Sequence, residues 1–456
     1  MERSTDRLSW GVRAGFGAGD FAQNLIYPAM SMYLLFFYTD VVGLAPATAA
    51  AMFLVAQTAD ALLTPLVGAF IDRRNPPWGK YRAYLLLAGL PLAALAALCF
   101  CNPFGAVGGA WKTAYAFATY MGFSLLFTLV NVSYGALGAS LTRSTEEITV
   151  LTAVRIFLAN AGCFAASAGV PLLVASISGT SPLPWRMALF MGFGILPSFI
   201  FMPLVPALRR RLGKKGLFYA FASVAVCGMA ALYVLSRMGG IENRIGWVYA
   251  AQFVKATGII VATGYMWALV PEVVTYSEQR TGRRVSGIVN AIIGVFFKAG
   301  MAIGKVVPGV VLAWTGYRAP DEQSSVSLPA DPRAWLWAIA AFAVVASVFL
   351  VFSFTQTKER VVMDAAAASQ VRAGDLWREF RQNAPLRILA LFFTASFAMM
   401  SVGNAAGAYF MNGLELQTPL AQEGIRQLVC VIPALLFAAA AAALARYPLA
   451  DAAPTH

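Results

Sequence analysis

The sequence predicts an all-α integral membrane protein with about twelve transmembrane helices. Hydrophobic residues make up 59% of its 456 residues and charged residues only 12%, about half the share that is usual in soluble proteins. Apolar runs of about 20 residues, long enough to cross a bilayer as a helix, follow one another from end to end. The segments that connect these runs are in turn rich and poor in Lys and Arg.

The apolar runs give the positions of the helices. Because backbone polar groups cannot be left open to lipid, a tightly packed bundle is the expected arrangement. We predict spans at 14–38, 46–70, 82–101, 113–140, 150–176, 186–207, 216–236, 246–270, 286–313, 334–354, 387–411 and 424–445.

The connecting segments carry Lys and Arg unevenly. About 23 of the 34 lie on one side of the predicted membrane and about six on the other. Lys and Arg concentrate in cytoplasmic loops, so both termini are predicted to be cytoplasmic. The net charge of +13 then reflects orientation in the cell inner (plasma) membrane, with lipid and not nucleic acid as the partner. The basic set comprises 1–13, 72–82, 142–149, 208–215, 271–285, 355–387 and 446–456.

Motifs of catalysis and ATP use are absent from the sequence. It has no P-loop, HExxH, GxSxG or CxxC pattern in a suitable context, and its one histidine is His456. We therefore expect no enzyme activity, no catalytic residue, no cofactor and no metal site, apart from a weak possible sodium site at Asp60. A chain of this kind is expected to carry a small solute across the membrane.

Ionisable side chains inside spans are costly and usually functional. Asp60 lies deep in the second span and Lys298 in the middle of the ninth. The two can be interpreted as a buried pair that is purely structural. Alternatively, they line a central cavity in which Asp60 takes up a proton or cation and Lys298 tunes its affinity. For Lys255 and Lys305 we expect snorkelling or a structural role.

Other polar and aromatic residues of the spans have the chemistry of a sugar site. Gln23 and Asn24 lie in the first span, Asn131 and Tyr134 in the fourth, and Trp267 in the eighth. Each amide or hydroxyl alone can be interpreted as a helix–helix hydrogen bond. Together they have the chemistry of a sugar site, because hydroxyl-rich ligands need amide or carboxylate partners and flat aromatic faces.

Basic cytoplasmic segments have two compatible interpretations. IDRRNPPWGKYR (71–82), RRRLGKK (209–215) and PEVVTYSEQRTGRRVSG (271–287) orient the chain in the membrane. They can also form a charged latch that closes the inner side during alternating access. The candidate latch residues are Arg73, Arg74, Lys80, Glu272, Arg283 and Arg284.

Several segments resemble the glycoside–pentoside–hexuronide:cation symporter family (melibiose permease-like) of the major facilitator superfamily. This resemblance covers nearly the whole chain and implies two six-helix bundles that transport a sugar with a cation by alternating access. The matching segments are LLFFYTDVVGL (34–44), ADALLTPLVGAFIDRR and WGKYR within 59–82, NVSYGAL (131–137), PEVVTYSEQRTGRRVSG to FFKAGMAIG (271–304) and FTQTKERV (354–361).

The resemblance also implies roles for single residues. Asp20 and Arg155 match residues at the family's sugar site, Asn131 stands in place of a sugar-binding aspartate, and Tyr134 lies beside a binding position. Asp60, Thr128 and Lys298 match residues of the cation site. The second acidic position of that site is Thr64 in this chain. One carboxylate holds sodium less well than two, so coupling to a proton, or no ion coupling at all, is expected rather than coupling to sodium.

The order of the helices differs from the order in the family. The resemblance places family helices one to five in 1–182, eight to eleven in 183–326, six and seven with the long cytoplasmic loop 355–387 in 327–418, and helix twelve with the tail in 419–456. The moved block contains an even number of helices, so each helix keeps its orientation. We expect the two bundles to interleave along the chain.

Three functions remain open from the sequence. The first is a monomeric secondary active symporter of a glycoside or other small sugar. The second is a carrier of lysolipids or other amphiphiles, as in one branch of the same family, which needs a more apolar cavity. The third is a non-transporting membrane sensor or an inactive rearranged scaffold.

Overall fold

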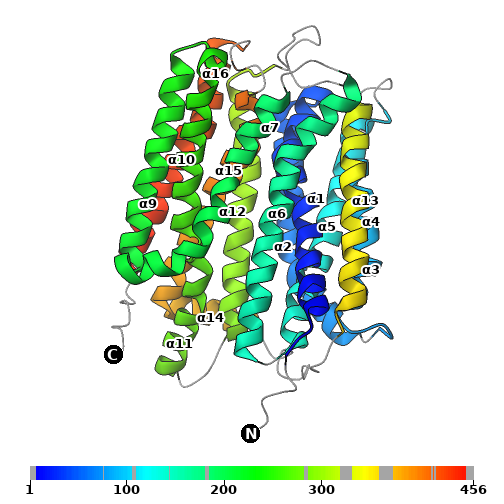
Figure 1. Ribbon diagram of the computed structural model, residues 1–456, viewed down its shortest axis with the longest axis vertical. Coiled ribbons are helices and arrows are strands. Elements are labelled where there is room, and N and C mark those ends of the chain that lie inside the picture. Colours follow the sequence, from blue (N-terminus) through cyan, green and yellow to red (C-terminus); the bar gives the residue numbers. More distant parts are fainter. Residues whose placement is uncertain are drawn as a thin grey trace. The chain divides into compact units, whose positions relative to one another are not determined.

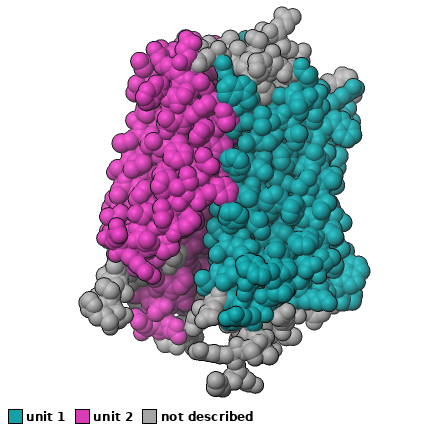
Figure 2. Space-filling model, in the orientation of Figure 1, with its two compact units in different colours: residues 1–188, 318–367 teal, residues 189–317, 368–456 magenta. Residues whose placement is uncertain are grey.

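A computed structural model describes residues 7–74, 76–104, 109–142, 144–179, 184–281, 286–318, 331–358, 373–411, 414 and 417–447. Within these residues every regular element is a helix (Figure 1), which confirms the predicted fold class. The chain forms two compact units, coloured separately in Figure 2. Unit 1 comprises Met1–Ala188 and Arg318–Ala367, and unit 2 comprises Leu189–Tyr317 and Ala368–His456.

Unit 1 combines N-terminal helices with one helix from much later in the chain. That late helix, α13, packs against the others through one face: the Trp335 ring stacks on Phe100 with centroids 5.9 Å apart, and the Phe349 ring centroid lies 4.5 Å from that of Phe21. Figure 1 shows α13 beside α4. The helices are α1 (Trp10–Phe36), α2 (Pro46–Arg73), α3 (Arg82–Leu87), α4 (Gly89–Cys99), α5 (Ala110–Leu141), α6 (Thr145–Ser178) and α13 (Pro332–Gln356).

Side-chain caps set where three of these helices begin. The N-cap side chains of Ser9, Ser144 and Asp331 accept hydrogen bonds from the first turns of α1, α6 and α13. The predicted span 82–101 is divided into α3 and α4 at Ala88. Pro91 follows within the first turn of α4, and its missing N–H explains why one helix does not continue through this point.

Unit 2 holds the remaining helices. α9 contains one non-helical residue, Gly213 at φ 69°, which separates the predicted spans 186–207 and 216–236. The helices are α7 (Pro184–Phe193, which begins in unit 1), α8 (Leu196–Phe201), α9 (Val205–Arg237), α10 (Ile245–Thr263), α11 (Leu269–Thr281), α12 (Ser286–Trp314), α14 (Ala373–Gln382), α15 (Ala384–Met411), α16 (Pro419–Arg426) and α17 (Ile432–Ala445). A π-helical turn (Gln427–Val431) joins the last two.

Ten stretches of the described chain are long and apolar enough to cross a membrane. One of them, Trp185–Arg237, is 53 residues long and is divided by Gly213 into two spans. α1 is outside this set because Asp20, Gln23 and Asn24 lower its hydropathy, yet its 27 residues are enough for a crossing. The described helices therefore accommodate the predicted twelve-span architecture.

Candidate functional site

Three residues predicted to bind sugar meet inside unit 1, each on a different helix. Asp20 on α1 accepts a hydrogen bond from Arg155 on α6, with 2.9 Å between Nε and Oδ2. The guanidinium carbon of Arg155 lies 5.4 Å from the ring centroid of Tyr134 on α5. Asp20 is buried, whereas 43% of the Arg155 side chain is exposed. Carboxylate, guanidinium and aromatic ring thus form one cluster with one accessible side.

Neighbouring residues hold this cluster in place. The Tyr134 ring stacks on Phe16 with centroids 4.8 Å apart, and its hydroxyl donates to the Phe16 carbonyl oxygen at 2.6 Å. Asn24 Nδ2 donates to the Asp20 carboxylate at 3.3 Å. A Cβ on Gly19 would lie 2.7 Å from the Tyr134 ring, so this position needs glycine. Among the described residues none accepts from Nη1 or Nη2 of Arg155, so these donors are available to a ligand.

The other two predicted sugar residues are placed differently. Asn131 is exposed on α5, close to one turn before Tyr134. Trp267 belongs to unit 2, where its half-exposed ring lies 4.9 Å from Phe393 and 5.9 Å from Phe297 between centroids. Three of the five predicted residues are therefore in mutual contact.

The predicted coupling residues of unit 1 also meet. Asp60 on α2 is buried, and one oxygen of its carboxylate accepts a hydrogen bond from the hydroxyl of Thr128 on α5. The Thr64 hydroxyl donates at 2.6 Å to the main-chain oxygen of Asp60. Lys298 lies on α12 in unit 2. Asp60 is thus a buried carboxylate of unit 1 with a hydroxyl bonded to it.

A further polar pair near Asp60 was not predicted. Gln57, about one turn earlier on α2, donates to the hydroxyl of Tyr120 on α5 at 3.1 Å. Both side chains are buried. The signal in the sequence is the i, i+3 spacing of Gln57 and Asp60, which places them on the same face of the helix.

The latch candidate Glu272 is bound within its own unit. Its carboxylate on α11 accepts hydrogen bonds from Arg209 at 2.8 Å and from Lys214 at 2.7 Å, both on α9. In unit 1, Arg74 lies over the Phe70 ring and Lys80 over the Tyr81 ring. The side chain of Arg73 and all of Arg283 and Arg284 lie outside the described residues.

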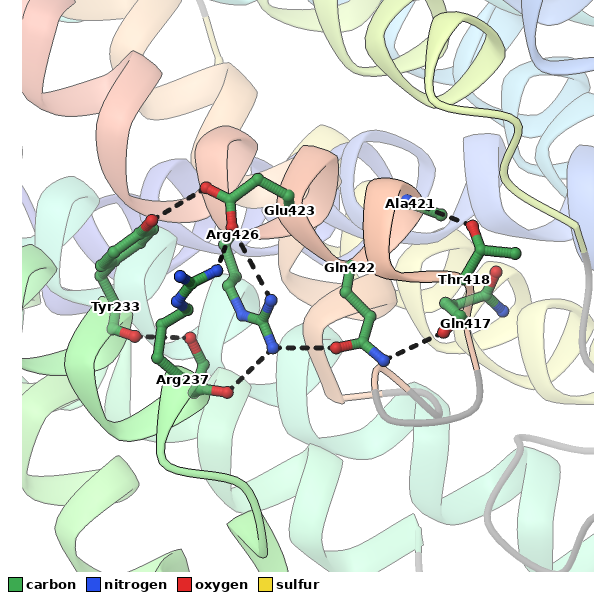
Figure 3. Close-up of polar contacts among 9 residues, drawn as sticks. Tyr233, Arg237, Gln417, Thr418, Ala421, Gln422, Glu423 and Arg426 are labelled. Carbon is green, nitrogen blue, oxygen red and sulfur yellow. Dashed lines mark hydrogen bonds and ion pairs between the residues drawn. The ribbon is translucent and has the colours of Figure 1, made fainter.

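A second ionic cluster of unit 2 lies at the end of α9 opposite its basic segment (Figure 3). The Glu423 carboxylate accepts from the Tyr233 hydroxyl at 2.8 Å and from Arg237 at 3.1 Å. Arg426 donates to the main-chain oxygen of Ser236 at 3.0 Å and to Gln422 at 2.9 Å. These contacts, absent from the sequence-based expectations, fasten α16 to the end of α9.

Comparison with known proteins identifies the family. The model of a family described as MFS/sugar transport protein matches residues 15–187, 183–330 and 324–415. The uncharacterized symporter YnaJ of Bacillus subtilis (strain 168) is 34% identical over 415 residues, covering 72% of this chain and 88% of the relative. The chain belongs to the glycoside–cation symporter family of the major facilitator superfamily. This symporter-family protein is a multi-pass transporter of the inner membrane and not an enzyme.

Two further relatives of this symporter-family protein have names that state a substrate. The isoprimeverose transporter of Lactiplantibacillus pentosus is 25% identical over 443 residues, covering 78% of this chain and 91% of the relative. The glucuronide carrier protein homolog of Escherichia coli (strain K12) is 27% identical over 401 residues, covering 70% and 86%.

Proposed function

We propose that this chain is a secondary active symporter that carries a glycoside or another small sugar by alternating access, coupled to a proton rather than to sodium. The main support for a sugar as the substrate is the cluster of Asp20, Arg155 and Tyr134. Its carboxylate accepts hydrogen bonds from hydroxyls, its guanidinium donates them, and its ring offers a flat apolar face. The names of the isoprimeverose and glucuronide relatives support the same class.

The surroundings of Asp60 support the proton as the coupling ion. Hard cations such as sodium bind where several oxygen atoms converge, whereas a buried carboxylate can take up a proton by itself. The position of a second acid is occupied by Thr64, whose hydroxyl is bonded to the main chain. In this proposal Asp60 carries the proton and Thr128 orients its carboxylate.

The remaining predicted residues complete the proposal. Asn131 and Trp267 contact the sugar, and Lys298 tunes proton release from Asp60. The cytoplasmic latch comprises Arg73, Arg74, Lys80, Glu272, Arg283 and Arg284. The functional unit is a monomer without a cofactor.

The proposed helix order has three supports. The family model matches in three segments that meet at 183–187 and 324–330, close to where the resemblance changes helix. The two compact units interleave along the chain, and residues 332–356 pack among the helices of unit 1. The alignment with the Bacillus symporter spans 415 positions and covers 88% of the relative but only 72% of this chain, so part of this chain has no counterpart at the same place in the order. A block of helices that stands at a different place in this chain than in the family accounts for all three observations.

Direct binding tests the substrate class. In purified protein reconstituted into nanodiscs, we expect saturable binding of a labelled aryl glycoside that free sugars displace and a lysophospholipid does not. The reason is that the described cluster offers charged and hydroxyl-matching groups, which an acyl chain cannot use. Saturable lysophospholipid binding that displaces the glycoside, or that occurs without any glycoside binding, contradicts the proposal.

A further inference from the structure

A short helix, α14 (Ala373–Gln382), stands before the membrane-spanning helix α15. It belongs to the segment 355–387, which the uneven distribution of Lys and Arg assigns to the cytoplasmic side. Figure 1 shows it at the lower end of unit 2, near α11. With 10 residues α14 is too short to cross a bilayer, so it lies at the cytoplasmic surface of its unit.

One face of α14 is fastened to this unit. The Phe380 ring stacks on Phe296 of α12 with centroids 5.2 Å apart. The Glu379 carboxylate accepts hydrogen bonds from the Ser277 hydroxyl of α11 at 2.6 Å and from Asn383 Nδ2 at 3.0 Å. These contacts fix which side of the helix points away from the unit.

The opposite face presents an aromatic ring among basic side chains. Trp377 is 66% exposed, and Arg378 and Arg381 are exposed as well. Because successive residues of an α-helix are about 100° apart around its axis, these three side chains lie within about 100° of one another. Arg387, exposed at the start of α15, donates from Nη1 to the main-chain oxygen of Arg381 at 3.1 Å. Its guanidinium therefore lies at the end of α14.

The charge of this face is not balanced within the chain. Among the side chains that the structure describes, no carboxylate forms an ion pair with Arg378, Arg381 or Arg387. The carboxylate of Glu379, next to Arg378 in the sequence, is bonded on the opposite face. The exposed face of α14 is therefore complementary to an anionic partner.

Two observations indicate that this partner is the membrane. Exposed tryptophans stand at the ends of other helices, as Trp10 does at the start of α1 and Trp314 at the end of α12. Tryptophan favours the headgroup region of a bilayer. Leu391, one turn after Arg387 on the same face of α15, is 57% exposed, and an exposed leucine in a span suits acyl chains. Arg387 therefore stands at the level of the headgroups, together with Arg381.

We propose that the exposed face of α14, together with Arg387, binds anionic phospholipids of the cytoplasmic leaflet. Arginine donates two parallel hydrogen bonds to phosphate oxygens, and the ring of Trp377 occupies the boundary between headgroups and acyl chains. Anionic lipids attract basic segments beside a span. This surface is separate from the sugar and coupling residues, and it does not depend on the proposed function.

Quenching of Trp377 fluorescence by brominated phospholipids tests this contact. The purified protein is reconstituted into phosphatidylcholine nanodiscs that contain a small fraction of phosphatidylglycerol or phosphatidylcholine brominated near the headgroup. The emission of Trp377 is the difference between the unchanged protein and Trp377→Phe. We expect both lipids to quench it, and brominated phosphatidylglycerol to do so at a fraction about fivefold lower or less.

Arginine variants test whether the preference belongs to this face. Arg378→Gln combined with Arg381→Gln is expected to remove the preference for phosphatidylglycerol while both lipids still quench Trp377. Arg210→Gln combined with Arg211→Gln is the matched control. It removes the same charge from two exposed arginines in the cytoplasmic basic segment of α9, in the same unit, and it is expected to keep the preference.

Three results overturn the proposal. Equal quenching by the two lipids in the unchanged protein, or quenching by neither, shows that Trp377 has no anionic lipid beside it. An equal loss of preference in the two double variants shows a diffuse surface potential in place of a site. Loss of preference on adding excess inorganic phosphate at constant ionic strength identifies a free anion, and not a lipid, as the occupant.

Discussion

Asp60→Asn is expected to abolish concentrative uptake while leaving downhill exchange partly intact. The amide oxygen of asparagine can still accept the hydrogen bond from Thr128, so packing at this position is preserved. It cannot take up a proton, and the free energy of the proton gradient no longer drives the sugar. One pH unit is worth about 1.4 kcal/mol per proton, which corresponds to about tenfold accumulation. The variant should bring the sugar to the same concentration on both sides.

The measurement is accumulation of a labelled glycoside in proteoliposomes with an imposed pH gradient, alongside exchange without a gradient. Glu278→Gln is the control, because it makes the same carboxylate-to-amide change at an exposed position of α11. It should accumulate sugar as the unchanged protein does. Accumulation against a gradient by Asp60→Asn would refute the coupling role.

The second large effect concerns Asp20 and Arg155. Asp20→Asn and Arg155→Gln are each expected to weaken glycoside binding by about 30-fold or more, in line with the loss of one partner of a hydrogen-bonded charge pair whose carboxylate is buried. Each single change also leaves one charge without its partner and should lower Tm. The double variant removes both charges, so we expect Tm to recover while binding stays lost.

A second ion pair between the same two helices provides the control for these variants. Arg13 and Glu147 join the same two helices, α1 and α6, by an ion pair with 2.7 Å between Nη2 and Oε1. Neutralising both by Arg13→Gln and Glu147→Gln should leave glycoside affinity unchanged. Recovery of glycoside binding in the Asp20 and Arg155 double variant shows that their pair is only structural, against the proposed role.

Most of the helix positions could be predicted because hydropathy reports the length of an apolar run. Interruptions within a run were missed where they depend on backbone geometry. The predicted span 82–101 breaks at Ala88, and 246–270 is divided into α10 and α11 by the 3₁₀ turn Met266–Ala268. Neither break changes the apolar composition, so the hydropathy pattern does not contain it.

The residues around the candidate site were harder to predict than the site itself. Asp20, Arg155 and Tyr134 were identified from a family resemblance, but Phe16 and Gly19 support them through contacts between distant helices. The ionic cluster around Glu423 joins side chains up to 190 positions apart. Ordinary surface residues have the same local sequence patterns, so only the folded chain distinguishes these contacts.

Uptake by proteoliposomes tests proton-coupled sugar transport most directly. A panel of labelled glycosides is offered under an imposed proton gradient, an imposed sodium gradient or neither. We predict that at least one glycoside accumulates when the outside is more acidic, that a protonophore abolishes this accumulation, and that sodium has no effect. Accumulation driven by sodium alone, or no accumulation of any glycoside under either gradient, contradicts the account.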